Sequence, residues 1–276
     1  MTDSMDPARA WSAVAQAWDA NADYVDEHSV EATTALLDRV AAQPGERVLE
    51  LAAGPGTLGA TWSQLVGPTG EVVVSDIAPG MVEVARRRNA ALGNVEAAVI
   101  DLAAIERPDS SFDVVACRMG LMFTPDPSVA LAEIFRVLRP GGRLGALTWA
   151  SIEHNPWMTC VGMAAMATGL ARGGPPVGPG GVFSLGDPAE LETVAKGAGF
   201  ADVAVEECAI TFRVATIDAH VERVSSLAGP LATLLREASP DQLAALRRTA
   251  ADLAAPYVTD SGLTIPGLAL LVSGRR

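Results

Sequence analysis

Residues 48–60 read VLELAAGPGTLGA, an apolar run that leads into a glycine-rich turn. Gly54, Gly56 and Gly59 have the G-x-G-x-x-G spacing of a loop that lets a dinucleotide pyrophosphate approach the backbone. A carboxylate, Glu50, lies inside the apolar run just before this loop. The stretch therefore predicts a strand followed by a nucleotide-binding turn, and Glu50 bears on which kind of nucleotide-like group binds there.

The pattern beyond this stretch is that of repeated strand–helix–strand units. From Gly45 onward, short apolar runs alternate with helix-length amphipathic runs, which is typical of a parallel sheet covered by helices. An apolar stripe at i, i+3, i+4 and i+7 over residues 131–138 predicts a helix that ends at residues 139–142, RPGG. The runs expected to form strands are RVLELA, EVVVSD, VEAAVIDL, FDVVACRM, RLGALTWA, DVAVEECAITFRV and GLALLVSGRR.

Two segments depart from this rhythm. Residues 150–186 contain LARGGPPVGPGGVF, whose glycine and proline content predicts an ordered loop or flap rather than regular structure. Residues 214–266 look mostly helical, with a helix start at Ser239-Pro240-Asp241, and precede the last strand. We therefore expect one domain with an N-terminal helical lid (1–44), a cofactor-binding core (45–149), the flap (150–186), the rest of the sheet (187–213 and 267–276) and a helical insertion (214–266).

Length and composition favour a single domain that does not bind nucleic acid. The chain has 276 residues, of which 49% are hydrophobic, enough to bury one large core. Its 33 acidic residues exceed its 20 lysines and arginines, and a net charge of −13 repels a phosphate backbone. The densest basic cluster, Arg86 to Arg88 before Asn89, is interpreted as the solvated end of a helix, where cations complement the dipole.

The cysteines and the first residues bear on the compartment. Three widely spaced cysteines without a C-x-x-C pair indicate neither a disulfide framework nor a zinc site. The first residues lack the basic start and apolar block of a secretion signal, and no run approaches the roughly 20 apolar residues of a membrane span. We expect a cytoplasmic protein with no integral membrane segment and no metal site.

Polar residues follow several of the expected strands. Asp76, Asp101 and the pair Cys117-Arg118 come at strand ends, as Glu50 does. In an open parallel sheet, ligands bind beyond the carboxyl ends of the strands, so these side chains are expected to converge on one site. Asp76 lies 20 residues after Gly56, where an acceptor for ribose hydroxyls is expected. The alternative roles are a tight strand-to-helix turn for the glycines and helix N-caps for the two aspartates.

Glu50 discriminates between cofactors. Burying a carboxylate in a strand costs several kcal/mol unless it is hydrogen-bonded or paired, and a nearby pyrophosphate would raise that cost. A cofactor that carries an ammonium or sulfonium group and no phosphate would instead stabilise the charge. An ion pair between Glu50 and an arginine is the alternative.

The motifs together resemble a known family. VLELAAGPG, DIAPGM, IDLAAI, SFDVVACRMGLMF and EIFRVLRPGGRL are similar to the motif series of class I S-adenosylmethionine-dependent methyltransferases, most of all the branch that includes the ubiquinone and menaquinone biosynthesis methyltransferases. The resemblance covers about residues 45–150. It implies an α/β, Rossmann-like fold with a seven-stranded, mostly parallel sheet, an antiparallel last strand and a helical cap, and S-adenosylmethionine as cofactor.

The resemblance also implies a set of cofactor-binding residues. Ala52 stands where the family usually has its first glycine, and its methyl group is accommodated if the residue keeps a negative φ. By position, the residues implied are Glu50, Leu51, Ala52, Gly54 and Gly56 around the methionine moiety, Asp76 at the ribose, Ile77, Asp101 and Leu102 around the adenine, the backbone of Cys117 and Met119 near the sulfonium, and Trp18 from the lid.

Methyl transfer needs few catalytic side chains. The reaction is an in-line displacement at a sulfonium methyl, and a base is required only if the acceptor is protonated at the working pH. His154, just past the fifth strand, is the candidate base. Arg118 could orient an anionic acceptor or pair with a nearby carboxylate. Further candidate proton donors or acceptors are His28, His220, Tyr24 and Tyr257.

We therefore expect transfer of a methyl group to a small, apolar or aromatic acceptor, with oxygen or nitrogen favoured and carbon as the alternative. An NAD(P)-dependent oxidoreductase and a non-enzymatic S-adenosylmethionine-binding protein are the rival functions, and a homodimer is left open. The side chains that could line an apolar acceptor cavity, or else pack in the core and lid, are Met119, Met122, Met158, Met163, Met166, Phe123, Trp149 and Trp157. For Met163 and Met166, at helical spacing, packing is favoured.

Overall fold

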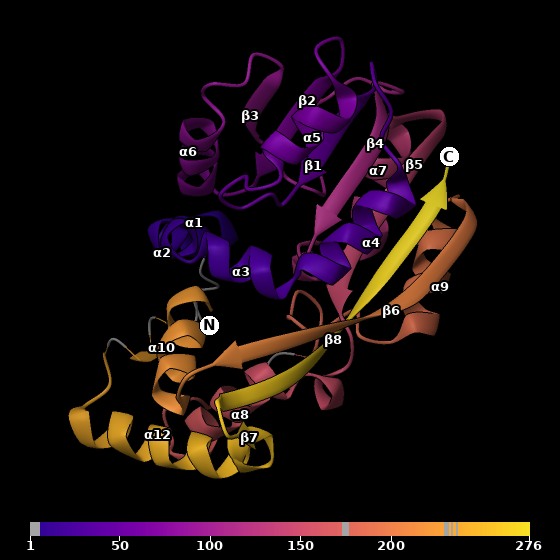
Figure 1. Ribbon diagram of the computed structural model, residues 1–276. Helices are drawn as coiled ribbons and strands as arrows, with labels where there is room; N and C mark the ends of the chain where they lie inside the picture. Colours follow the sequence, from indigo (N-terminus) through magenta and orange to yellow (C-terminus); the bar gives the residue numbers. More distant parts are fainter. Residues whose placement is uncertain (1–5, 173–176, 229–231, 233, 236) are drawn as a thin grey trace.

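The computed structural model describes residues 6–276 apart from 173–176, 229–231, 233 and 236. Within these residues the chain forms one mixed sheet in the order β3-β2-β1-β4-β5-β8-β6, with the short β7 paired to β8 (Figure 1). The strands are β1 (Arg47–Leu51), β2 (Glu71–Asp76), β3 (Val95–Val99), β4 (Phe112–Arg118), β5 (Leu138–Trp149), β6 (Ala201–Val214), β7 (Val258–Thr259) and β8 (Gly262–Arg275).

The sheet confirms the predicted Rossmann-like fold. β1 pairs in parallel with β2 and β4, β2 with β3, and β4 with β5, whereas the last strand, β8, runs antiparallel to β5 and β6. The strand count differs slightly from the seven expected, because β7 folds back on the start of β8 as an eighth strand. The strand order reverses between β1 and β4, which is where such sheets bind ligands.

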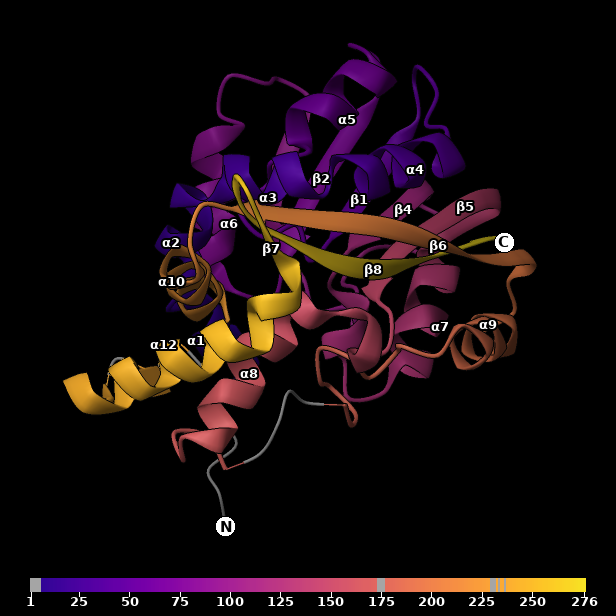
Figure 2. The same cartoon turned by 60° about the horizontal axis from the view of Figure 1, so that its bottom comes forward.

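Helices cover both faces of the sheet. Figure 2 shows α4 and α5 on one face and α7 and α9 on the other. Covered on both sides, β1, β2 and β4 are buried at nearly every position, which explains their continuous Val and Leu runs. The helices around the sheet are α4 (Val30–Val40), α5 (Gly59–Val66), α6 (Pro79–Arg88), α7 (Pro127–Val137) and α9 (Pro188–Gly197).

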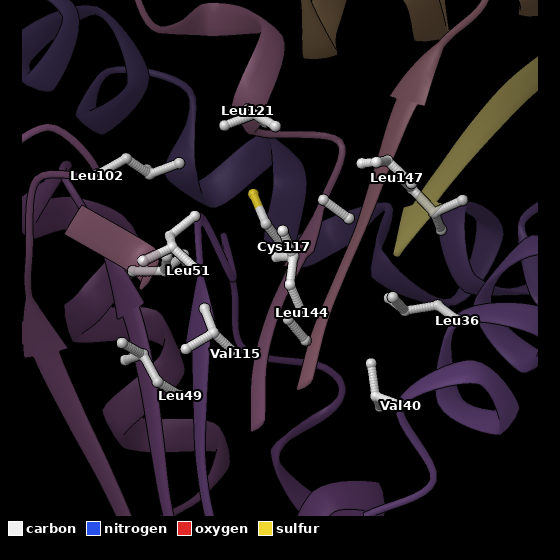
Figure 3. Close-up of a cluster of buried hydrophobic side chains, with 14 of the residues drawn as sticks. Leu36, Val40, Leu49, Leu51, Leu102, Val115, Cys117, Leu121, Leu144 and Leu147 are labelled. Carbon is white, nitrogen blue, oxygen red and sulfur yellow. The ribbon is translucent and has the colours of Figure 1, made fainter. Parts of the chain in front are cut away.

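Helix α4 shows how tightly these layers pack. Leu36 and Val40 point from α4 into the buried cluster over β5 (Figure 3). A Cβ at Gly145 of β5 would lie 2.5 Å from Val40 Cγ1 and 2.7 Å from a Leu36 methyl carbon. Gly145 therefore lets α4 approach the strand, and α4 belongs to the sheet layers although it lies within the first 44 residues.

The remaining helices gather at one end of the sheet. In Figure 1, α1, α2 and α3 lie beyond the carboxyl ends of the strands, and α8, α10 and α12 surround the far half of β6 and β8. None of the described helices combines the length and apolar composition needed to cross a bilayer. Their bounds are α1 (Pro7–Ser12), α2 (Ala15–Ala20), α3 (Ala22–His28), α8 (Pro156–Ala167), α10 (Ile217–Leu227) and α12 (Pro240–Ala254), with 3₁₀ turns η1 (Leu121–Phe123), η2 (Ile152–His154) and η3 (Ala255–Tyr257).

The prediction of no regular structure for residues 150–186 is wrong for α8. The glycine- and proline-rich part begins only after this helix, and its residues 173–176 lie outside the described range. α8 packs against α12 and β8 on one side, and its exposed side also carries apolar residues, so it lacks a polar face that would have revealed its period. Packing was expected of Met163 and Met166, but both are exposed, at 37% and 39%.

Two other element boundaries differ from those expected from the sequence. α7 ends at Val137, and residues 139–142 form the irregular start of β5 next to a register shift against β4. β8 begins at Gly262, five residues before the expected strand, because it pairs along the whole length of β6. The start of α12 agrees with the sequence, since Ser239 and Gln242 form a reciprocal capping box there.

Candidate cofactor site

The glycine loop joins β1 to α5, and its three glycines have different structural roles. Gly54 and Gly56 have positive φ angles of 55° and 71°. A Cβ at Gly54 would meet nothing within 4 Å, whereas one at Gly56 would lie 2.7 Å from Ala85 Cβ and one at Gly59 2.2 Å from Asn89 Oδ1. Gly54 thus leaves space on the ligand side of the loop, while Gly56 and Gly59 allow the loop to pack against α6.

Asn89 is a structural residue that the sequence analysis missed. Its side chain is buried and its Nδ2 donates to the carbonyl oxygens of Gly56 at 3.0 Å and Ala85 at 2.9 Å.

The neighbouring arginines are exposed in part, but Arg87 and Arg88 both pair with Asp19 of α2. The end of α6 is therefore bonded to the glycine loop and to the N-terminal helices rather than simply solvated.

Glu50 lies beneath the loop and faces inward. Its side chain is buried, and Oε2 accepts a hydrogen bond of 3.1 Å from Trp62 Nε1 on α5. Burial raises the pKa of Glu50 to about 7, and the positive charge of Arg118 acts in the opposite direction. In the described part of the chain Glu50 forms no ion pair, so the alternative of direct pairing with an arginine is not met. The carboxyl group therefore changes charge near neutral pH.

Asp76, at the end of β2, connects two loops. Its Oδ2 accepts from the backbone N–H of Gly54 at 3.0 Å and its Oδ1 from that of Ala78 at 2.9 Å. Burial raises the pKa of Asp76, while these hydrogen bonds act to lower it. Asp76 thus bonds the turn that leads into α6 but is not the N-cap of that helix, which is Ala78, and each oxygen keeps a further lone pair for a ligand hydroxyl.

The backbone is strained at the ends of β1 and β4. Ala52 and Met119 have φ angles of 50° and 59°, in the left-handed region that residues other than glycine rarely adopt. The condition given above for accommodating the Ala52 methyl group, a negative φ, is therefore not met. A Cβ at Gly120 would lie 2.2 Å from Ala52 Cβ and 3.1 Å from Cys117 Sγ. The missing side chain of Gly120 makes room for the methyl group of Ala52, a compensation that sequence reasoning did not find.

This compensation predicts non-additive stability effects. Gly120→Ala should lower the free energy of unfolding by about 1–3 kcal/mol through overpacking, and Ala52→Gly should raise it by up to about 1 kcal/mol by relieving the left-handed conformation. When Ala52 is already glycine, the further change Gly120→Ala should lower the free energy of unfolding by clearly less. The loss that remains comes from the contact of the new methyl group with Cys117 Sγ. Urea unfolding of the four proteins measures the coupling, and strictly additive values would refute the contact.

Arg118, the last residue of β4, joins the strand to three other segments. Its Nη1 lies 2.7 Å from Asp26 Oδ1 of α3 and 3.3 Å from Thr33 Oγ1 of α4, and its Nη2 donates to Thr57 Oγ1 at 2.8 Å. The Thr57 hydroxyl in turn donates to Asp26 at 3.1 Å. Arg118 is therefore paired with a carboxylate rather than free to orient an acceptor, and it ties α3 to the glycine loop.

Several expected cofactor residues are core residues through their side chains. Leu51, Leu102 and Cys117 are buried in the central cluster (Figure 3). Burial raises the pKa of the Cys117 thiol to about 12, so its sulfur is not a nucleophile near neutral pH. Ile77 is half-buried. Asp101 is exposed and accepts a hydrogen bond of 2.8 Å from the backbone N–H of Ala103, a local turn like that of a cap.

Trp18 anchors the N-terminal helices. Its Nε1 donates to the Leu227 carbonyl oxygen at 3.1 Å, and its ring packs edge-on against Trp11 with centroids 6.2 Å apart. Both rings pack on a small cluster that includes Ala78 and Met81. Trp18 therefore lies near the residues that follow Asp76, on the side of the ribose and adenine positions implied by the resemblance.

The three histidines have separate surroundings. His154 is exposed on η2, with its Nδ1 3.0 Å from Ser151 Oγ. His28 is buried between the carbonyl oxygens of Tyr24 and Arg213, and His220 is buried with its Nε2 facing a carbonyl oxygen of α8. Burial lowers the pKa of His220. Among the described contacts, none joins a histidine to Glu50, Asp76 or Arg118, and the role of His154 as a base stays a prediction.

The residues at this edge of the sheet fit a cationic ligand without phosphate. The open side of Gly54 lets a ligand approach the loop. Glu50 supplies a buried carboxyl group with no ion-pair partner in the described chain, and Asp76 supplies acceptors for hydroxyl groups. An ammonium near Glu50 would compensate the cost of burying its charge, whereas a pyrophosphate would add to it.

The chain is similar in sequence to known methyltransferases. Residues 48–142 match the family model described as a methyltransferase domain. The ubiquinone/menaquinone biosynthesis C-methyltransferase UbiE of Erwinia tasmaniensis is 41% identical over 123 residues, which are 44% of this chain and 49% of that protein. The same enzyme of Pseudoalteromonas translucida is 42% identical over 114 residues, 40% of this chain and 45% of that protein. The chain thus spans about half the length of these curated relatives.

Solved structures show the same fold. The YcgJ protein from Bacillus subtilis aligns over 88% of this chain and 97% of its own, with a TM-score of 0.56 and 20% identity. Phosphoethanolamine N-methyltransferase 2 of Haemonchus contortus, in complex with phosphomonomethylethanolamine and S-adenosylhomocysteine, aligns over 88% of this chain and 52% of its own, with a TM-score of 0.55 and 19% identity. Residues 48–142 therefore match a methyltransferase domain and are similar in sequence to the UbiE C-methyltransferases, and the chain shares the fold of these solved structures.

Proposed function

We propose that the chain transfers a methyl group from S-adenosylmethionine to a small aromatic acceptor that carries a hydroxyl group. The observation that carries the proposal is Glu50, a carboxyl group buried beneath the glycine loop with a pKa near 7. The names of the curated relatives support a quinol-like acceptor and methylation at carbon. They therefore favour carbon over the oxygen or nitrogen that the sequence analysis preferred.

Each residue of the site has a role in this reaction. S-adenosylmethionine supplies an electrophilic methyl group on a positively charged sulfur. Glu50, ionised, would hold the ammonium of the cofactor, and Asp76 would accept from the ribose hydroxyls. Because the sulfur loses its charge as the methyl group leaves, a dry site that aligns donor and acceptor lowers the barrier. The network of Arg118, Asp26 and Thr57 keeps α3 over the loop and so helps to exclude water.

Aromatic side chains support an aromatic acceptor. Trp149 ends β5, next to β4, at the same edge of the sheet as the cofactor residues. Its ring centroid lies 4.7 Å from that of Trp157 on α8 and 6.3 Å from that of Phe212 on β6. In the proposed reaction, these rings would offer stacking and apolar contact to a planar acceptor.

Binding and turnover measurements test the proposal. S-adenosylhomocysteine should bind saturably in calorimetry and NADH should not, because the pyrophosphate of NADH would face Glu50. Incubation with methyl-labelled S-adenosylmethionine and a panel of phenols, hydroquinones and heteroaromatics should then give a methylated product, and mass spectrometry with NMR locates the methyl group. Binding of NADH would support the oxidoreductase, and saturable S-adenosylhomocysteine binding without product on the whole panel would support a non-enzymatic protein.

A further inference from the structure

A cavity of about 290 Å³ lies away from the glycine loop. It is formed where the end of β6 meets α3 and α10, three elements that are labelled in Figure 1. None of its lining residues belongs to the cofactor site described above. The side chains that characterise it are Tyr24, Glu27 and His28 of α3, Arg213 of β6 and Arg223 of α10.

Two arginines line this cavity with little compensating charge. In the described chain the guanidinium of Arg213 has no ion pair or hydrogen bond. Arg223 donates from Nη1 to Asn21 Oδ1 at 2.8 Å, but its Nε is buried without a partner. Glu27 is the one carboxylate among the lining residues, and it is exposed. In a protein with a net charge of −13, two guanidinium groups without a carboxylate partner at one cavity indicate a site for an anion.

Aromatic rings form one side of the cavity. The guanidinium carbon of Arg223 lies 3.7 Å from the centre of the Tyr24 ring, which positions this cation. Tyr24 packs against His28 at 4.0 Å between ring centroids, and His28 stacks on Phe212 at 5.8 Å. The cavity therefore combines flat apolar surface with guanidinium donors, which suits a small organic acid.

The position of α3 connects this cavity to the cofactor site. Asp26 bonds to Arg118 and Thr57, whereas Tyr24 and His28 lie two residues away on either side. Residues two apart on a helix point in nearly opposite directions, about 200° around the axis. One side of α3 thus faces the glycine loop and the other faces the cavity.

We propose that this cavity is a binding site for a small molecule with a carboxylate or phosphate group, held by Arg213 and Arg223. A ligand there would fix α3 from the side opposite Asp26, and so favour the closed network of Asp26, Arg118 and Thr57. By linkage, binding of the anion and binding of the cofactor then strengthen each other. The inference stands on the cavity itself and does not depend on which acceptor the enzyme methylates.

Calorimetric titrations with two probes, inorganic phosphate and benzoate, test the site and distinguish the two anion chemistries. At least one probe should bind saturably to the full chain, and Arg213→Gln and Arg223→Gln should each weaken that binding about tenfold or more. Arg47→Gln is the matched control, because Arg47 is exposed at the amino end of β1 and pairs with Glu71. Retained melting temperatures would establish that the variants fold, and Arg213→Glu, at an exposed position, should abolish binding.

The coupling is measured in the same proteins. A saturating probe should tighten S-adenosylhomocysteine binding severalfold in the wild type and in Arg47→Gln, but not in Arg213→Gln or Arg223→Gln. The site would be refuted if neither probe binds. It would also be refuted if the two cavity variants bind the probes as tightly as the control variant Arg47→Gln does. An unchanged S-adenosylhomocysteine affinity would refute the coupling. Because S-adenosylhomocysteine binding without probe is measured in parallel, failure of the cofactor assignment would be seen separately.

Discussion

Glu50→Gln should weaken binding of S-adenosylhomocysteine by about 2–5 kcal/mol, the range for truncating one member of a buried, hydrogen-bonded charge pair. Glutamine keeps the size of the side chain and an oxygen that can accept from Trp62 Nε1, so the variant removes the charge alone. Isothermal titration calorimetry measures the difference. Glu71→Gln is the control, because Glu71 is exposed and pairs with Arg47 at the other end of the sheet. Equal affinities for Glu50→Gln and wild type would remove the physical basis of the cofactor assignment.

The same variant predicts a pH dependence. Without cofactor, burial raises the pKa of Glu50 to about 7, so below this pH the group must lose a proton before it can pair with the ammonium. The affinity of the wild type should therefore rise by up to about tenfold per pH unit below pH 7 and level off above it, while Glu50→Gln shows no such rise. A flat profile in the wild type would contradict the assignment.

Stability without cofactor gives an independent readout of this titration. The folded protein keeps the proton of Glu50 up to about pH 7, whereas the unfolded chain releases it near the ordinary glutamate pKa of 4.5. The unfolded state therefore binds fewer protons between these values, and Glu50 makes the unliganded protein less stable as the pH rises through that window, by about 3 kcal/mol in total. Urea unfolding of wild type and Glu50→Gln should differ in pH slope there.

Asp76→Ala should weaken S-adenosylhomocysteine binding by about 1–3 kcal/mol, because it removes the acceptors for the ribose hydroxyls. The structure adds a second effect of the substitution. Asp76 also accepts from the backbone N–H groups of Gly54 and Ala78, so the alanine variant leaves both donors without this partner and loosens the loop. Asp76→Asn retains one side-chain oxygen, so it should lose less of the ligand affinity and less of the order of the loop than Asp76→Ala does.

A change of ligand separates the two roles of Asp76. An S-adenosylhomocysteine analogue that lacks the 2′- and 3′-hydroxyls cannot donate to Asp76, so the wild type and Asp76→Ala should bind this analogue with nearly the same affinity. Calorimetry with both ligands completes the cycle, which isolates the hydroxyl contact from effects on the loop. If Asp76→Ala weakens both ligands equally, the aspartate acts on the loop alone and the ribose contact is refuted.

The sequence alone was enough to predict the sheet and two of the central carboxylates. The continuous apolar runs of β1, β2 and β4 are visible because strands buried on both faces need apolar residues at nearly every position. Glu50 and Asp76 could be singled out because their places next to a glycine loop and at a strand end are local properties of the chain. Helix α8 was missed because its exposed side is apolar like its buried side, which removes the amphipathic period on which such predictions depend.

Only the tertiary structure decided how these parts fit together. Gly120 makes room for Ala52 across 68 residues of sequence, and Arg118 meets Asp26 across 92. Asn89 turns inward to the glycine loop, and Arg213 and Arg223 meet α3 around one cavity. Periodicity and spacing describe each segment by itself, whereas close packing, left-handed backbone and charge pairing depend on which distant segments come into contact. Those contacts arise only when the helices pack on the sheet.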